Sequence, residues 1–313
     1  MSLLRSLSVV TASVGSLLLL AGCAHGPQSA GNHSHVHARV EGATVAGGPR
    51  YAVDALWPKP LPNNWILGQV AGIAVDRNDT IWLIHRPLTL TDDEKGAALT
   101  PPRSKCCVAA PPVLQFDRAG NLLRSWGGKG TGYDWPANEH GIYVDPKGDV
   151  WVGGNANTDG MLLKFTPDGK FLMQIGKPGK SEGSNSTTQL SRPAHMELDA
   201  DANELFVADG YGNRRVIVFD AATGAYKRHW GAYGKKPEDG NFPNYNPESA
   251  HFGMPVHCVR MTKDNLVYVC DRMNNRVQIF NKKGEFLKQF VYDAATQGSG
   301  STWDLVPSED AAQ

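Results

Sequence analysis

The stretch MPVHCVRMTKDNLVYVCDRMNNRVQIF, from Met254 to Phe280, decides the fold of this chain. Apolar and polar residues alternate in two short runs on either side of a polar turn at Thr262 to Asn265, and a loop leads into a third run. Alternation over runs of this length predicts half-buried β-strands. We therefore expect a β-hairpin followed by a third strand. The same pattern occurs three more times upstream.

The four copies share residue types at fixed positions. The second strand carries an aromatic residue, the third strand ends on phenylalanine, and a glycine-containing turn leads into a fourth strand. Repeated units of four antiparallel strands are typical of β-propeller blades, which bury their faces only by stacking on one another. The sequence thus predicts an all-β protein, a β-propeller of four-stranded blades. The first strands read GIAVD (72–76), HGIYVD (140–145), HMELD (195–199) and HCVRM (257–261); the aromatic residues are Trp82, Trp151, Phe206 and Tyr268, and the phenylalanines are Phe116, Phe165, Phe219 and Phe280.

A fifth copy begins at Trp303-Asp304-Leu305-Val306, shortly before the last residue of the sequence. A propeller that stops inside a blade would leave unpaired sheet edges, which favour aggregation. We therefore expect residues 51–313 to hold about four and a half blades of a propeller that is truncated at its C-terminus.

The charge balance of the chain limits its partners. The 313 residues include 31 basic and 31 acidic side chains, so the net charge is near zero. A nucleic-acid-binding protein needs a basic surface to neutralise phosphates, and this composition argues against one. Long helical periodicity is absent, while 34 glycines and 20 prolines indicate frequent turns.

The first 23 residues are typical of a lipoprotein signal peptide. Arg5 precedes an apolar run that ends in Leu20-Ala21-Gly22-Cys23, which resembles a bacterial lipoprotein box. This resemblance implies cleavage before Cys23 and its lipidation, and hence an exported protein anchored to a membrane surface of the cell envelope. The alternative is a plain secretory signal with an incidental cysteine. Residues 24–50 form a polar tether whose histidines could bind metal but are better explained as solvated; these are His25, His33, His35 and His37.

The four remaining cysteines are expected to meet oxidising conditions in an exported protein. Cys258 and Cys270 lie equally far from the turn at Asp264, so they face each other across the predicted hairpin. They could form a cross-strand disulfide or remain two buried thiols, and we favour thiols because such a bridge is strained. Cys106 and Cys107 are adjacent in a proline-rich insert at residues 87–112.

Two positions of the repeat bring polar residues together. In a blade, the start of the innermost first strand lies beside the end of the second strand, so residues at these positions converge near the central axis. Histidine occupies the first position in the second and fourth copies, at His140 and His257. The second position holds Arg86 and Arg272, and Tyr211 follows it in the third copy. These residues predict a metal site beside an anion-binding site.

Each of these residues also has a simpler explanation. Two histidines could line a solvated channel mouth, an arginine could pair with an acid of the neighbouring blade, and Tyr211 could be a rim aromatic. His195 is one residue out of phase with the other two histidines, which turns its side chain to the opposite side of its strand. It is the joint occurrence of the residues that favours a functional site.

The repeats resemble two known sequence patterns. VADGYGNRRVIVF (207–219) and VCDRMNNRVQIF (269–280) resemble NHL repeats. The chain also resembles the peptidyl-α-hydroxyglycine α-amidating lyases. The segments that match the landmarks of that family, in order, are GQVAGIAVD followed by IHR, then EHGIYVD, DGYGNRRVIVF, and PVHCVRM followed by CDR. The similarity covers roughly residues 67–300. It implies a six-bladed propeller that cleaves a C–N bond, releases glyoxylate and leaves a peptide amide.

The resemblance also implies roles for single residues. His140 and His257 would bind zinc, and Tyr211 would act as the general base. Arg86 and Arg272 would bind the carboxylate of a small carboxylated or peptide-like substrate. A third histidine that would complete the zinc site is not found in phase in this sequence.

The resemblance further implies a structural calcium ion, held by the backbone carbonyls of Ile73 and Ile142. Two other functions remain open. One is a non-catalytic propeller that binds a protein or ligand on its open face. The other is a calcium-dependent lactonase-type propeller, which would require acidic and amide ligands near the axis rather than histidines.

Overall fold

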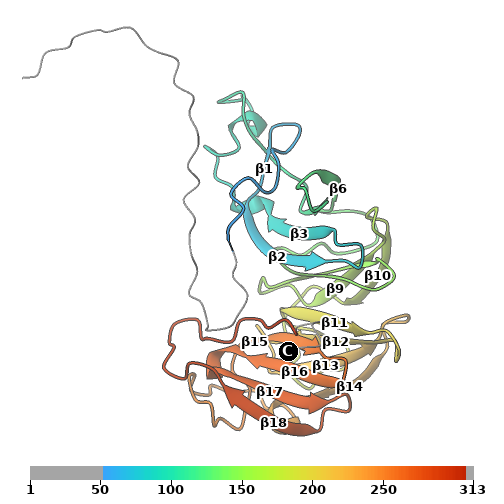
Figure 1. Cartoon of the computed structure of the whole chain (residues 1–313), viewed down its shortest axis with the longest axis vertical. Coiled ribbons are helices and arrows are strands. Elements are labelled where there is room, and N and C mark those ends of the chain that lie inside the picture. Colours follow the sequence, from blue (N-terminus) through green and yellow to red (C-terminus); the bar gives the residue numbers. More distant parts are fainter. Residues whose placement is uncertain (1–51, 308–313) are drawn as a thin grey trace, which may run out of the picture. The chain divides into compact units, whose positions relative to one another are not determined.

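The computed structural model describes residues 52–307 (Figure 1). The chain divides into two units, Met1–Asp54 and Ala55–Gln313. Of the first unit only residues 52–54 are described, so the predicted signal peptide, Cys23 and the histidines of the tether lie outside the described residues. Nowhere in residues 52–307 is there a helix that is long and apolar enough to cross a membrane.

Four antiparallel four-stranded sheets make up the second unit, as the repeat predicts. In each sheet the four strands are neighbours in chain order, which is the connectivity of a propeller blade. The strands are β2 (Gln69–Val75), β3 (Ile81–Arg86), β5 (Val113–Phe116) and β6 (Leu122–Trp126) in blade one; β7 (Glu139–Val144), β8 (Val150–Gly154), β9 (Met161–Phe165) and β10 (Phe171–Gly176) in blade two; β11 (His195–Asp199), β12 (Glu204–Asp209), β13 (Arg215–Asp220) and β14 (Tyr226–Trp230) in blade three; and β15 (Val256–Met261), β16 (Leu266–Asp271), β17 (Arg276–Asn281) and β18 (Phe286–Val291) in blade four.

The remaining elements are short. Strand β1 (Trp65–Ile66) pairs in parallel with β4 (Val108–Ala109), which lies in the proline-rich insert. The insert also contains two 3₁₀ turns, η1 (Pro87–Thr89) and η2 (Gly96–Ala98). Two further 3₁₀ turns are η3 (Ala232–Gly234) and η4 (Arg272–Asn274).

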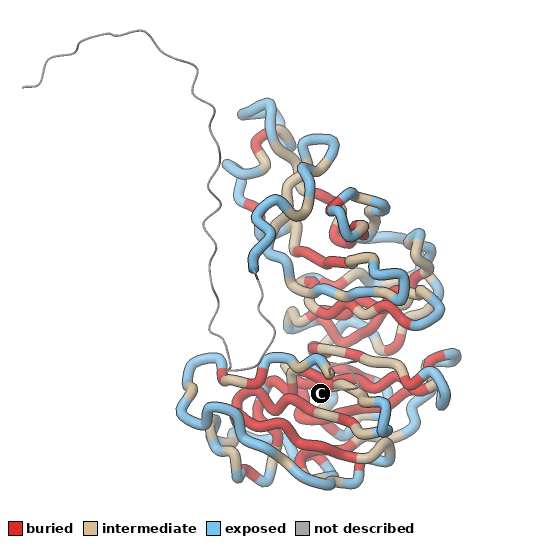
Figure 2. The backbone as a smooth tube through the Cα atoms, in the orientation of Figure 1, coloured by how far each residue is buried: buried red, intermediate tan, exposed pale blue. Residues whose placement is uncertain are grey.

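The hydrophobic core lies between consecutive blades. One cluster joins blade one to blade two, a second joins blade two to blade three, and a third joins blade three to blade four. The aromatic residues of the second strands, Trp82, Trp151 and Phe206, are fully buried in these clusters. Figure 2 shows the buried segments along the strands and the exposed ones in the connections. Because each blade buries its faces only against its neighbours, the core specifies the order in which the blades stack.

At blade one, the end of this stack of blades is partly exposed. On the first strand of blade one, Val70, Ile73 and Val75 are more than half exposed. The predicted start of a fifth blade, residues 303–306, has no assigned strand and instead contacts blade four. The four described blades therefore stack without closing a ring.

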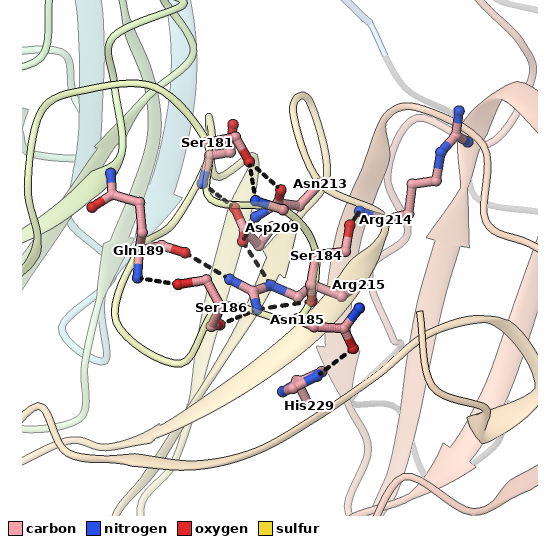
Figure 3. A network of polar contacts seen from close by, with 12 residues as sticks. Ser181, Ser184, Asn185, Ser186, Gln189, Asp209, Asn213, Arg214, Arg215 and His229 are labelled. Carbon is pink, nitrogen blue, oxygen red and sulfur yellow. Dashed lines mark hydrogen bonds and ion pairs between the residues drawn. The ribbon is translucent and has the colours of Figure 1, made fainter. Parts of the chain in front are cut away.

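Buried arginines attach long loops to blades three and four. In blade three, the guanidinium of Arg215 is fully buried and pairs with Asp209 at 2.9 Å (Figure 3). It also donates to the carbonyls of Ser184 and Gln189, at 2.9 and 2.8 Å, and to that of Ser186. Arg215 thus holds the loop that leads into the blade.

Blade four has an equivalent ion pair, between Arg276 and Asp271, at 2.8 Å. Both of these side chains are fully buried. Arg276 donates to the carbonyls of Pro247 and His251, at 2.7 and 3.0 Å. The two arginines occupy the same place in the repeat, although the loop that precedes Arg276 is one residue shorter. The NHL-like pattern therefore has a structural basis in these buried ion pairs.

The prediction of free thiols at Cys258 and Cys270 is wrong, because the two residues are joined in a disulfide. They lie directly opposite each other on β15 and β16, and their Cα atoms are 4.8 Å apart. This separation is within the range that a disulfide spans without backbone movement. Cys106 and Cys107 of the insert are also joined.

Candidate active site

Four of the predicted site residues come from blades two, three and four, at starts of first strands or just after ends of second strands. His140 is the second residue of β7 and His257 is the second residue of β15. Tyr211 follows the end of β12, and Arg272 follows the end of β16. The starts of first strands pair with the ends of second strands, for example Val256 with Asp271. This register explains why residues distant in sequence meet at one place.

The hydroxyl group of Tyr211 is the centre of the cluster. Its oxygen lies 2.9 Å from Nε2 of His140 and 3.1 Å from Nε2 of His257. Nη1 of Arg272 donates to the same oxygen at 3.3 Å. The two imidazole rings are 5.5 Å apart between centroids. Four polar side chains from blades two, three and four therefore converge on one point.

Tyr211 is held in place by its backbone. A side chain at Gly210 would overlap the backbone of Val256, so glycine allows the loop to approach β15 closely. The backbone N–H of Tyr211 donates to the carbonyl of Arg192 at 3.3 Å, and the side chain of Arg192 donates back to the carbonyl of Tyr211. These contacts direct the phenol ring toward the two histidines.

Both histidines are neutral at pH 7. Burial, together with unfavourable charge interactions with His257 and Arg86, lowers the pKa of His140 to about 4. Burial also lowers the pKa of His257 to about 4, assisted by the charge of Arg272 and opposed by a hydrogen bond to the carbonyl of Trp303. Neutral imidazole is the form that binds metal ions.

The two histidines fit a zinc ion as part of its coordination shell. Their Nε2 atoms face a common oxygen, and imidazole nitrogen is a preferred zinc ligand. Within residues 52–307, no third histidine, cysteine or carboxylate joins them; the group of potential ligands found there is Cys258, Cys270 and Asp304. Because the two cysteines of that group are bonded to each other, they are not available as thiolates.

The two predicted arginines differ in their surroundings. Arg272 is buried, with 8% of its surface exposed, and within residues 52–307 its Nε has no hydrogen-bond partner. Arg86 instead donates through Nε to the carbonyl of Glu139 at 2.7 Å and through Nη1 to Gln69 at 3.3 Å. Glu139 directly precedes His140 in the chain. Arg272 therefore belongs to the centre of the cluster, whereas Arg86 lies beside His140.

The other residues singled out in the sequence lie in the first strands of blades one to three. Ile73 and Ile142 are in β2 and β7, the first strands of neighbouring blades, and the calcium ion implied there stays a prediction. His195 is outside the cluster, because its Nδ1 lies 3.0 Å from the carbonyl of Val259. This position agrees with the phase of His195 in the repeat.

One residue of the site was missed from the sequence. The carbonyl of Trp303 accepts a hydrogen bond from Nδ1 of His257, and the indole ring lies against Arg272. The sequence places Trp303 at the start of a fifth copy of the repeat, which by itself gives it no role in the site.

Comparison with known proteins supports the predicted resemblance. The sequence model of the NHL repeat matches residues 256–280. The chain is 26% identical over 255 residues to peptidyl-alpha-hydroxyglycine alpha-amidating lyase 1 of Drosophila melanogaster, which covers 77% of the chain and 42% of the relative. It is also 26% identical over 246 residues to peptidyl-glycine alpha-amidating monooxygenase B of Xenopus laevis, covering 76% of the chain and 26% of the relative.

A third relative has a name that states no activity. NHL repeat-containing protein 3 of Mus musculus is 26% identical over 248 residues, covering 76% of the chain and 59% of the relative. The chain thus spans between 26% and 59% of the length of these three relatives. Among solved structures, a streptogramin B lyase has a TM-score of 0.44 and 12% identity, covering 72% of the chain and 56% of that structure. The chain is an all-β protein of propeller blades that carries an NHL repeat and is similar in sequence to the peptidyl-α-hydroxyglycine α-amidating lyases.

Proposed function

We propose that this protein is a zinc-dependent lyase that acts on peptides ending in α-hydroxyglycine. The reaction breaks the bond between the amide nitrogen and the hydroxylated carbon. The hydroxyl proton leaves, its oxygen becomes the aldehyde oxygen of glyoxylate, and the nitrogen takes up a proton to give the peptide amide. No oxidant or water is consumed.

The observation that carries this proposal is the convergence of His140, His257 and Arg272 on the hydroxyl of Tyr211. As the phenolate, an oxygen that is held among three neighbours can accept the hydroxyl proton of a substrate placed against it and become the neutral phenol. Zinc held by His140 and His257 would supply Lewis acidity toward that hydroxyl group. Arg272, buried and with a free Nε, supplies a positive charge for the substrate carboxylate.

The surroundings of the site support the same substrate. The guanidinium of Arg86, which donates to the carbonyl of Glu139 at 2.7 Å, adds a second positive charge beside His140. The disulfide between Cys258 and Cys270 supports an oxidising location outside the cytoplasm, in line with the proposed export and lipid anchor at Cys23.

A product assay tests the proposal. Zinc-loaded protein is incubated with benzoyl-α-hydroxyglycine, and glyoxylate and benzamide are measured. The expected result is that both products form in equal amounts and that benzoylglycine, which lacks the hydroxyl group, is not cleaved. The absence of both products from folded, zinc-loaded protein would contradict the proposed function.

A further inference from the structure

The segment of residues 300–305, which follows β18, crosses blade four beside the candidate site. It has no assigned strand and is held by side-chain contacts. Asp304 accepts two hydrogen bonds from Arg260 of β15, at 3.2 and 2.8 Å. Leu305 packs against the disulfide between Cys258 and Cys270.

The start of the segment is attached to the loop after β16. Gly300 has a φ of +76°, and a side chain at this position would overlap the carbonyl of Arg272. The backbone N–H of Ser301 donates to Oδ1 of Asn275 at 2.8 Å. The indole N–H of Trp303 donates back to the carbonyl of Gly300 at 2.9 Å. The segment is therefore anchored on both sides of Trp303.

Trp303 contacts two residues of the site through two different groups. Its carbonyl accepts a hydrogen bond from Nδ1 of His257 at 2.5 Å. Its indole ring lies beneath the guanidinium of Arg272, whose Cζ is 4.1 Å from the ring centroid. The ring also meets the imidazole of His257 edge to face, at 5.5 Å between centroids.

We propose that Trp303 is a positioning residue for this site, whose carbonyl orients His257 and whose indole ring orients Arg272. A carbonyl that accepts from Nδ1 places the proton there and leaves the lone pair on Nε2, the atom that faces Tyr211. The face of an indole ring attracts a guanidinium and limits its rotation. The polar contact of the Arg272 side chain in the cluster is the long one to Tyr211, at 3.3 Å, and the indole face gives the guanidinium a second support.

The two contacts can be separated by mutation, because one uses the main chain and the other the side chain. Trp303→Ala keeps the carbonyl beside His257 and removes the ring beneath Arg272. Trp303→Phe restores an aromatic face. Leu305→Ala is the matched control, since it weakens the packing of the same segment at the disulfide between Cys258 and Cys270.

In zinc-loaded protein, Trp303→Ala is expected to raise the KM for benzoyl-α-hydroxyglycine and the dissociation constant for glyoxylate, each about tenfold. Zinc content should be unchanged. Trp303→Phe should recover most of the affinity, and Leu305→Ala should leave it at the native value. Unchanged glyoxylate affinity in Trp303→Ala, or an equal loss in Leu305→Ala, would overturn the proposal.

This inference rests on the proposed function for its substrate, so one readout is independent of turnover. In the native protein, the Nε–H proton resonance of Arg272, assigned with Arg272→Lys, should be shifted upfield by the indole ring. The shift should disappear in Trp303→Ala while the nitrogen resonances of His257 keep the Nδ1–H tautomer. Absence of glyoxylate release together with these shifts would reject the lyase and retain the positioning role; absence of the shifts would reject the positioning role.

Discussion

Tyr211→Phe is expected to release glyoxylate about a thousandfold more slowly than the native protein, because the substitution removes the proposed general base. The phenol oxygen contacts both Nε2 atoms and Arg272. Phenylalanine retains the ring, whose centroid lies 4.9 Å from that of His140 and 5.6 Å from that of His257. The measurement is kcat with zinc-loaded protein, with zinc content and circular dichroism determined on the same sample.

The matched control for this prediction is Tyr226→Phe. Tyr226 is partly exposed on β14, where its hydroxyl contacts His229 at 2.9 Å, outside the site. The control should retain native kcat. A Tyr211→Phe protein that keeps its zinc and turns over at the native rate would show that Tyr211 does not take the proton.

Arg215→Met is expected to destabilise the protein by about 3–5 kcal/mol, because it breaks a buried ion pair by removing one partner. Arg215 and Asp209 are fully buried, and the guanidinium also satisfies the carbonyls of Ser184, Ser186 and Gln189. Methionine fills a similar volume, but it removes the hydrogen bonds that Arg215 donates to the carboxylate of Asp209 and to these three backbone carbonyls. The free energy of unfolding in urea measures the effect.

An exposed arginine provides the control for this second prediction. Arg118 pairs with Asp79 at 3.5 Å, and both side chains are largely exposed, so Arg118→Met should change stability by less than about 1 kcal/mol. Equal effects of the two substitutions would mean that the buried ion pair does not stabilise blade three.

Much of the fold could be predicted because the repeat specifies both strand order and phase. The aromatic residues of the second strands and the phenylalanines that end the third strands lie in the expected strands. The same phase rule brought His140, His257 and Tyr211 together and placed His195 elsewhere. Period-two alternation makes such predictions possible, because a shift of one residue moves a side chain to the opposite face.

Other features depend on contacts that alternation does not encode. The opposition of Cys258 and Cys270 was predictable from the turn, whereas the bond between them depends on the local separation of the strands. Arg86 was predicted in the site, but its guanidinium bonds to a backbone carbonyl beside His140. Trp303 was expected to begin a strand, and its segment instead packs across blade four through Asp304 and Leu305.

The central claim is that His140 and His257 bind zinc together. It is tested most directly by measuring bound zinc after equilibration and gel filtration, on a chain whose tether histidines are replaced by asparagine (His25, His33, His35 and His37). We expect one zinc ion per chain, lost in His140→Ala and in His257→Ala but retained in the control His229→Ala, whose ring contacts Tyr226 and Asn185 outside the site. Folded protein that binds no zinc, or that keeps it in both site variants, would contradict the account.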